Sequence, residues 1–186
     1  MNLPIALTLC RIVLVPLIIV FLISSSRVHV LIAAVIFIAA SLTDWLDGRM
    51  ARRWNQVTRL GTLLDPVADK LLLTSAFVTL TYLKVIPFWI AVVVVSRDLV
   101  LSVGVLVIHV AGGTVQPAPS WLGKLSTVFQ MATVLAAMIS FYFGALQALP
   151  RLFAWVTAVF TVTSGLQYII QGLKQINPPA GVGERS

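Results

Sequence analysis

The sequence is poor in charged residues, and acidic residues are the scarcest. Only 10% of its 186 residues are charged and only six are Asp or Glu, whereas about a quarter of a typical soluble domain is charged. The hydrophobic share is 59%. This composition excludes an ordinary soluble domain and indicates an integral membrane protein. Long uninterrupted apolar runs favour helices over barrel strands, in which polar and apolar residues would alternate.

Cysteine is nearly absent too, since Cys10 is the single one, which excludes an internal disulfide. The net charge is +7, but the basic residues are scattered at the ends of apolar runs. We therefore expect no nucleic-acid partner, and we expect anionic lipid headgroups or phosphate-bearing substrates instead. The first apolar run contains Arg11 and lacks a small-residue cleavage site, so we expect a retained span rather than a signal peptide.

The apolar runs predict an all-α protein, a polytopic membrane bundle of six transmembrane helices. The expected spans are residues 5–25, 29–53, 61–84, 87–110, 121–146 and 150–173. Residues 1–176 are expected to form a single membrane domain. Residues 177–186 begin with Asn-Pro-Pro, which cannot continue a helix, so we expect a loose C-terminal tail.

The distribution of basic residues predicts the orientation in the membrane. The loop between the second and third spans carries Arg49, Arg52, Arg53 and Arg59, and the loops facing the other way carry single basic residues, Arg27, Lys84 and Arg151. The positive-inside rule then places both termini and the arginine-rich loop on the cytoplasmic side. We expect a multi-pass protein, of a bacterial inner membrane, with its active site at the cytoplasmic face.

Four of the six acidic residues lie together at the junction of two apolar runs. Asp44 and Asp47 are three residues apart in one expected helix, and Asp65 and Asp69 are four apart in the next. Each spacing places the pair on one helix face, and the short connecting loop makes the two helices antiparallel neighbours. A carboxylate near the hydrocarbon layer is costly unless it is paired, hydrated or metal-bound. Four converging carboxylates suit Mg²⁺, Mn²⁺ or Ca²⁺ rather than zinc.

A single Asp near a helix end is more often a helix cap or the partner of an arginine. Four of them, with Gly48, Ala51 and Gly61 at fixed offsets, are poorly explained as caps. The small residues allow either close approach of a ligand to the backbone or close helix packing. Arg52 is suited to bind a phosphate group through two hydrogen bonds.

These residues form the pattern D-x2-D-G-x2-A-R-x8-G-x3-D-x3-D. The pattern resembles the signature of the CDP-alcohol phosphotransferase family, and all eight fixed positions match. The segments Leu7-Thr8-x-x-Arg11 and Gly123-Lys124, the latter with Thr127 and Gln130, resemble the first and fifth helices of the family. The resemblance implies six transmembrane helices, a homodimer, and transfer of a substituted phosphoryl group from a CDP-linked donor to an alcohol, with release of CMP.

The resemblance also implies a role for each residue of the pattern. Two divalent ions, Mg²⁺ or Mn²⁺, are bound by the four aspartates and clamp the diphosphate of the donor. Asp69 is in addition the candidate catalytic base that takes the proton of the acceptor hydroxyl. The donor-binding residues are Gly48, Ala51, Arg52 and Gly61. This arrangement provides the positioning, charge neutralisation and proton removal that phosphoryl transfer needs.

The remaining cations bear on the acceptor. The chain looks most like the glycerophospholipid branch, which includes phosphatidylglycerophosphate synthases, acting on glycerol 3-phosphate, and cardiolipin synthases, acting on phosphatidylglycerol. Val105 and Ser126 stand where the former typically carry Arg and Lys. The candidate acceptor-binding residues are Arg97, Lys124 and Arg11. Because two cations are missing, we lean to phosphatidylglycerol as acceptor and keep glycerol 3-phosphate as the alternative.

Asp98, next to Arg97, has two interpretations. Neighbouring residues of a helix point about 100° apart, so this pair need not interact directly. Asp98 either bridges to a basic residue of another helix or contributes to the acceptor site. His29 and His109 lie near the ends of expected helices and are interpreted as interfacial. Three tryptophans are expected to anchor the protein at the membrane interface, Trp89, Trp121 and Trp155.

Two other functional classes compete with an enzyme. A divalent-cation transporter also carries intramembrane carboxylates, but here the aspartates cluster at one face and no span adds a carboxylate ladder across the bilayer. A non-catalytic binding protein is disfavoured because no aspartate of the pattern is lost. We therefore expect a phosphatidyltransferase that converts CDP-diacylglycerol and a glycerol-type alcohol into a phospholipid and CMP.

Overall fold

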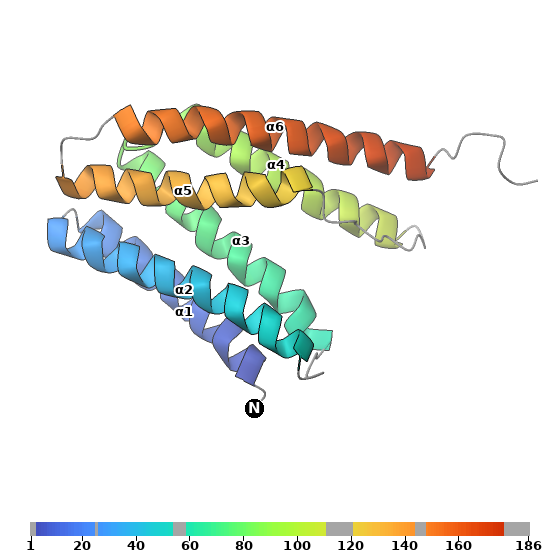
Figure 1. Ribbon diagram of the computed structural model, residues 1–186, viewed down its shortest axis with the longest axis horizontal. Helices are drawn as coiled ribbons and strands as arrows, with labels where there is room; N and C mark the ends of the chain where they lie inside the picture. The colour runs from blue at the N-terminus through green and yellow to red at the C-terminus, as the bar shows by residue number, and fades with distance from the viewer. Residues whose placement is uncertain (1–2, 25, 54–58, 111–120, 144–147, 177–186) are drawn as a thin grey trace, which may run out of the picture.

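The computed structural model is a bundle of six helices, with no strand in the part of the chain that it describes (Figure 1). The structure describes residues 3–24, 26–53, 59–110, 121–143 and 148–176, and the side chains of residues 8–24, 26–43, 67–104, 121–143 and 148–172. The helices are α1 (Leu3–Ile23), α2 (Arg27–Arg53), α3 (Arg59–Tyr82), α4 (Phe88–Val110), α5 (Trp121–Phe143) and α6 (Ala148–Ile176). The all-α prediction is confirmed. The predicted tail, 177–186, lies outside the described residues.

Successive helices run in opposite directions, so the bundle has two distinct ends (Figure 1). At one end, on the left in Figure 1, α1, α3 and α5 finish and α2, α4 and α6 begin. We call it the turn end. At the other end α2 finishes at Arg53 and α3 begins at Arg59. We call it the aspartate end, because the predicted metal ligands belong to the last part of α2 and the first half of α3.

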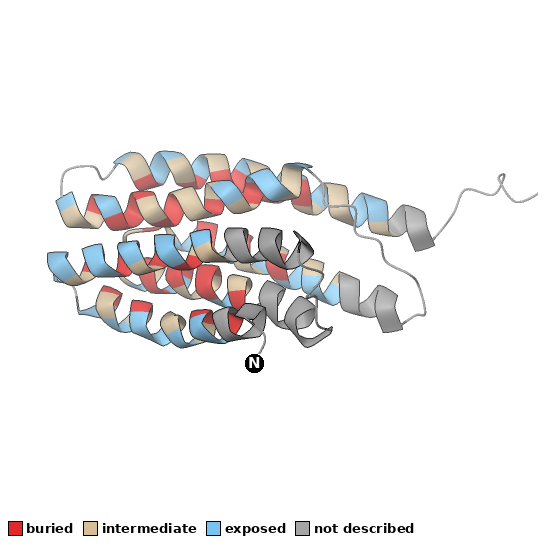
Figure 2. Ribbon diagram, turned by 60° about the horizontal axis from the view of Figure 1, so that its bottom comes forward, coloured by how far each residue is buried: buried red, intermediate tan, exposed pale blue. Residues whose placement is uncertain are grey.

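The helices pack as two groups joined through the centre of the bundle. α1 packs against α2 and α3, α5 packs against α6, and α4 packs against α6. α3 and α2 also contact α5. The core is apolar, and its largest fully buried side chains include Phe37, Phe77, Leu72 and Leu80. Figure 2 shows these buried positions facing the interior of the bundle, while exposed residues cover its outside.

The outer surface of the bundle is itself rich in large apolar side chains. Val13, Val78, Phe88 and Val159 are each more than half exposed. α5 and the Ala148–Gly172 part of α6 are long and apolar enough to cross a membrane, and shorter apolar helices cover Thr8–Ile23 and Arg27–Thr43. These findings support a membrane location. Six membrane crossings stay a prediction, since two helices of the described chain meet the length and composition of a span.

A ladder of polar side chains joins α5 to α6 inside this apolar bundle. Thr133 and Thr157 share a hydrogen bond of 2.7 Å, and Ser126 and Thr161 share one of 3.0 Å. Gln130 Nε2 donates to Thr161 Oγ1 at 3.3 Å. Such contacts hold helices together where water is absent and apolar burial adds little. The ladder therefore sets the position of α6, whose next turn reaches the charged residues described below.

Candidate functional site

The two helices predicted to carry the aspartates are both present. α2 continues through Asp44 and Asp47, and α3 contains Asp65 and Asp69. Both pairs therefore keep the helical spacing that the sequence predicted. The side chains of several predicted metal and donor ligands lie outside the described residues: Asp44, Asp47, Gly48, Ala51, Arg52, Gly61 and Asp65. Among the described side chains no group of three or more His, Cys, Asp or Glu is suited to hold a metal ion. The metal site thus stays a prediction.

Asp69 is the one predicted aspartate of the pattern whose side chain is described, and it is partly buried. The next residue, Lys70, reaches across to α4. Its Nζ donates to Ser102 Oγ at 2.8 Å and to the main-chain oxygen of Asp98 at 3.3 Å. Ser102 Oγ in turn donates to that same oxygen at 2.8 Å. Lys70 therefore ties α3 to α4 directly beside the candidate base.

Arg97 and Asp98 form an ion pair although they are neighbours on α4. Arg97 Nη1 lies 2.8 Å from Asp98 Oδ1, and the two side chains are 13% and 11% exposed. Of the two interpretations of Asp98, the bridge to a basic side chain of another helix is not seen among the described residues, where Asp98 pairs with its own neighbour. The long arginine side chain spans the angle between adjacent positions, and its Nη2 donates to Ser164 Oγ on α6 at 3.3 Å. We refer to Lys70, Arg97, Asp98, Ser102 and Ser164 as the Arg97 cluster.

Small residues on the facing helices allow α4 and α6 to pack closely around this cluster. A Cβ atom added at Gly165 would lie 3.5 Å from Arg97 Cγ, and one added at Gly104 would lie 3.4 Å from Tyr168 Cε1. The interface also contains polar atoms with unused hydrogen-bonding capacity. Within the described part of the chain, Arg97 Nε and the Tyr168 hydroxyl are buried at this interface without a hydrogen-bond partner. The α4–α6 interface is thus polar as well as tightly packed.

The other two candidate acceptor cations occupy different settings. Arg11 on α1 is 3% exposed and lines a cavity of about 120 Å³ against α2, next to Ala40 and Thr43. Lys124 is exposed at the start of α5, with its Nζ 5.4 Å from the centre of the Trp121 ring. Such a contact is a weak cation–π interaction at an exposed site. The interactions of the described side chains do not link these two cations with Arg97.

The structure describes the side chain at only one of the two positions where a cation is missing. The side chain of Val105 lies outside the described residues. Ser126 is fully buried and belongs to the α5–α6 ladder. Here a neutral hydrogen bond between helices replaces the charge that a lysine would have supplied. Gln130, which is part of the resemblance to the fifth helix of the family, belongs to the same ladder.

The sequence analysis missed three members of the Arg97 cluster, Lys70, Ser102 and Ser164. Lys70 had a usable signal, because an ionisable residue inside an apolar helix is a functional-site candidate by default. Ser102 and Ser164 had none, since isolated serines are common in helices of membrane proteins. Whether these two serines join the cluster depends on how α3, α4 and α6 pack.

The residues predicted to be interfacial lie near the ends of the bundle where they are described. Trp89 and Trp155 lie near the turn end with ring centres 4.8 Å apart, and Trp121 is 80% exposed at the start of α5. His29 hydrogen-bonds Ser24 in the α1–α2 turn. The side chain of His109 lies outside the described residues.

Comparison with known proteins identifies the family. Residues 1–163 match the CDP-alcohol phosphatidyltransferase family. The chain is 36% identical over 181 residues to the CDP-diacylglycerol–glycerol-3-phosphate 3-phosphatidyltransferase of Bacillus subtilis (strain 168), covering 90% of this chain and 93% of the relative. It is 36% identical over 171 residues to the protein of that name from Escherichia coli (strain K12), with the same coverage. It is 34% identical over 145 residues to the cardiolipin synthase (CMP-forming) of Streptomyces coelicolor, covering 75% of this chain and 66% of the relative. The complete aspartate pattern and these matches agree, and the chain belongs to the CDP-alcohol phosphatidyltransferase family.

Proposed function

We propose that this protein transfers the phosphatidyl group of CDP-diacylglycerol to glycerol 3-phosphate and releases CMP, working as a homodimer with its active site at the cytoplasmic face. The observation that carries the reaction class is the complete aspartate pattern on α2 and α3, in a chain that matches relatives with this activity over nine tenths of its length. The acceptor differs from the one that the sequence analysis favoured, because both the relatives and the Arg97 cluster support glycerol 3-phosphate.

The donor side of the proposal rests on the carboxylates. Helical spacing is kept within both pairs, Asp44 with Asp47 and Asp65 with Asp69, and carboxylate oxygens are the ligands that Mg²⁺ and Mn²⁺ prefer. Two such ions, when bound, neutralise and orient the diphosphate of the donor. The donor-binding residues next to them are Gly48, Ala51, Arg52 and Gly61.

The transfer itself is a substitution at the phosphorus of the phosphatidyl group. The acceptor hydroxyl oxygen forms the new bond to phosphorus, the bond from phosphorus to the CMP oxygen breaks, and CMP leaves with the bonding electrons. The Asp69 carboxylate takes the proton of the acceptor hydroxyl. Asp69 lies inside α3 beside the buried residues Ala68 and Leu72, so the packing of this helix face positions its backbone for the task.

The acceptor side rests on cations held in place before the substrate arrives. Arg97 is oriented by Asp98 and Ser164, and Lys70 by Ser102 and the main chain of α4. Lys70 supplies a positive charge that the count of missing cations had left out. Oriented cations bind a phosphate more tightly than flexible ones, because less side-chain freedom is lost on binding. This favours the phosphomonoester of glycerol 3-phosphate.

The test compares the two acceptors directly. Purified protein in mixed micelles with saturating CDP-diacylglycerol is offered glycerol 3-phosphate or phosphatidylglycerol, and kcat/KM is measured from CMP release. We expect glycerol 3-phosphate to be preferred at least about tenfold, which is the contribution of one charge-assisted contact. A clear preference for phosphatidylglycerol would contradict the proposal. Divalent-cation uptake into proteoliposomes without CMP release would instead indicate a transporter.

Phosphatidylglycerol is the second candidate acceptor, which would make the protein a cardiolipin synthase. The similarity to the Streptomyces coelicolor cardiolipin synthase favours it. So does Ser126, because its burial in the α5–α6 ladder leaves that position without a charge. A phosphodiester acceptor carries less negative charge than a phosphomonoester and needs fewer cations.

A further inference from the structure

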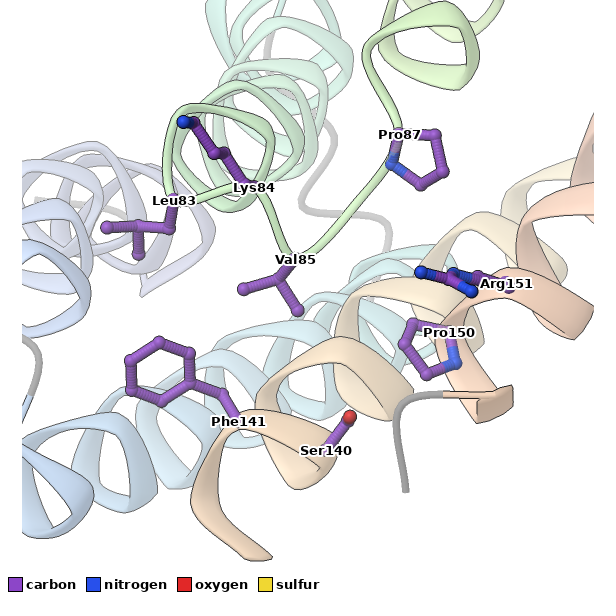
Figure 3. Close-up of a pocket in the computed structure, with 8 residues that line it drawn as sticks. All are labelled: Leu83, Lys84, Val85, Pro87, Ser140, Phe141, Pro150 and Arg151. Atoms are coloured by element: carbon purple, nitrogen blue, oxygen red, sulfur yellow. The ribbon is translucent and has the colours of Figure 1, made fainter. Parts of the chain in front are cut away.

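A second polar cavity lies at the turn end of the bundle. It has a volume of about 510 Å³ and is enclosed by the α3–α4 turn, the last part of α5 and the first turn of α6 (Figure 3). Its lining combines two cations and a hydroxyl with apolar side chains: Lys84, Arg151, Ser140, Leu83, Val85, Pro87, Phe141 and Pro150. We call it the Lys84–Arg151 cavity. None of these residues belongs to the family pattern or to the proposed acceptor site.

The cavity is separated from the candidate catalytic base, Asp69, by more than half the length of α3. Leu83 follows Asp69 by 14 positions along the chain, which is about 21 Å at the helical rise of 1.5 Å per residue. The cavity also lies where the two clearest candidate spans, α5 and α6, have neighbouring ends. Trp89 and Trp155, whose rings contact each other in a tilted arrangement, lie nearby, and tryptophan is enriched at the level of lipid headgroups. The cavity is therefore placed at a membrane surface, opposite the aspartate end.

The two cations of the cavity have no carboxylate beside them among the described residues. The sequence contains no Asp or Glu between Asp98 and Glu184. Within the part of the chain that the structure describes, neither Lys84 nor Arg151 forms an ion pair. Figure 3 shows the Arg151 guanidinium pointing from α6 toward the α3–α4 turn across the cavity. An anion from outside the chain would meet this charge without displacing an internal partner.

Ser140 adds an unused hydroxyl to the same cavity. The residue is 4% exposed, and its Oγ has no hydrogen-bond partner among the described residues. Figure 3 shows this oxygen pointing from α5 toward the cavity. Most helical serines in apolar surroundings bond to a carbonyl of the preceding turn, as Ser41 does with Phe37 at 2.8 Å. This oxygen is not among the fully buried atoms of the described chain that lack a partner, so it is reached from the cavity and is available for a polar ligand.

The backbone at Lys84 gives an independent reason to regard this residue as functional. Its φ angle is 59°, and α3 ends there in a Schellman motif. The Val85 N–H donates to Leu80 O at 3.0 Å and the Lys84 N–H to Thr81 O at 2.9 Å. Glycine is the usual residue at this position, because a side chain is disfavoured in the left-handed region. Lysine is disfavoured at this φ angle, and unlike glycine it supplies a positive charge.

We propose that the Lys84–Arg151 cavity binds the phosphate of an anionic phospholipid in the leaflet opposite the aspartate end. The Arg151 guanidinium presents paired donors to two phosphate oxygens, and the Ser140 hydroxyl donates to the same group. The Lys84 side chain points from the turn away from Arg151 in Figure 3, and it adds a second charge at the rim of the cavity when it rotates toward the phosphate. The apolar residues Leu83, Val85 and Phe141 contact the glycerol and the first methylenes. This apolar half of the lining, together with the position at the membrane surface, selects a lipid over free phosphate. The bound lipid would join the α3–α4 turn to α5 and α6.

The test measures lipid binding to the purified full-length protein without donor or turnover. Because phosphatidylglycerol is also a candidate acceptor, the cavity variants decide which of the two sites binds it. Native mass spectrometry and thermal unfolding in detergent are followed during titration with phosphatidylglycerol, phosphatidylcholine or inorganic phosphate. We expect phosphatidylglycerol to bind and to raise the unfolding temperature, and the other two to have little effect. Equal protection by inorganic phosphate, or equal binding of phosphatidylcholine, would overturn the assignment to an anionic lipid.

Matched variants locate the binding. The double variant K84G/R151A is expected to weaken phosphatidylglycerol binding at least about tenfold, and S140A to weaken it less. K84G relieves the positive φ angle, and thermal unfolding without lipid shows whether K84G/R151A is folded. R27A removes one positive charge from the same end of the bundle, where Arg27 is exposed and lies outside the cavity, and is expected to bind as the unaltered protein does. Unchanged binding by K84G/R151A would overturn the proposal.

Discussion

The Arg97 cluster and the Lys84–Arg151 cavity use positive charge in opposite ways. In the Arg97 cluster each cation is held by neighbours within the chain: Arg97 by Asp98 at 2.8 Å, and Lys70 by Ser102 at 2.8 Å. In the cavity, Arg151 and Lys84 have no carboxylate partner among the described residues. The first arrangement fixes the direction of its charges and the second leaves its charges open to an external anion.

The difference shows what kind of anion each region suits. Cations that are already oriented lose little freedom when a small, dissolved substrate arrives, and turnover requires that the substrate also leaves. Cations without internal partners at a membrane surface attract an anion that is always present, and a lipid headgroup fits that description. The same residue types thus support a transient acceptor in one place and a resident lipid in the other. The predictions below test this division.

Removal of divalent metal is expected to have the largest effect. If Asp44, Asp47, Asp65 and Asp69 hold Mg²⁺ or Mn²⁺ on the donor diphosphate, a chelator should abolish CMP release, and either metal should restore it. Lipid binding in the Lys84–Arg151 cavity should be unaffected by the same chelator, because no carboxylate lines that cavity. Full turnover in excess chelator would remove the metal from the proposal.

Asp69→Asn should come next, with a loss of at least about 100-fold in kcat. Asparagine keeps the shape of the side chain and removes both the charge and the proton acceptor. The measurement is CMP release by the purified variant, with thermal unfolding and oligomeric state as controls for folding. A rate near that of the unaltered protein would exclude Asp69 as the base.

Arg97→Ala should raise KM for glycerol 3-phosphate by about 10-fold to 100-fold, because one charge-assisted contact to phosphate is lost. Arg97→Lys should recover only part of this, since an ammonium cannot bond Asp98, Ser164 and substrate in the fork geometry of a guanidinium. Arg27→Ala is the matched control and should leave KM unchanged. If Arg97→Ala lowers stability but leaves KM unchanged, Arg97 has a structural role and the acceptor binds elsewhere.

Lys84→Gly should have the smallest effect, and in the direction of greater stability. Glycine relieves the positive φ angle at the end of α3 but gains freedom in the unfolded chain, so we expect an increase of up to about 1 kcal/mol in unfolding free energy. Lys84→Ala removes the same charge and keeps the strained angle, so it should bring no such gain. Thermal unfolding without added lipid measures both. Catalytic rates should stay unchanged, because Lys84 lies far from the Arg97 cluster.

The helices and the family could be predicted from the sequence for clear physical reasons. Uninterrupted apolar runs between polar breaks define helices of membrane length, and the described helix bounds differ from the predicted ones by a few residues in most cases. The eight-residue pattern depends only on residue types and spacing within α2 and α3, so it can be read without a structure. The acceptor was harder to predict. The sequence analysis counted cations only at positions where family members typically carry them, and Lys70 was not one of those positions.

What the sequence determined by itself is therefore local: the apolar helices, the aspartate spacing and the scarcity of carboxylates after Asp98. Contacts between distant segments were decided by the tertiary structure. The bond from Arg97 to Ser164 joins residues 67 positions apart, and the Lys70 bond to Ser102 joins residues 32 apart. The meeting of Lys84, Ser140 and Arg151 around one cavity has the same origin. Helical periodicity specifies which residues share a face of one helix, but only the packing of α3, α4, α5 and α6 specifies which faces meet.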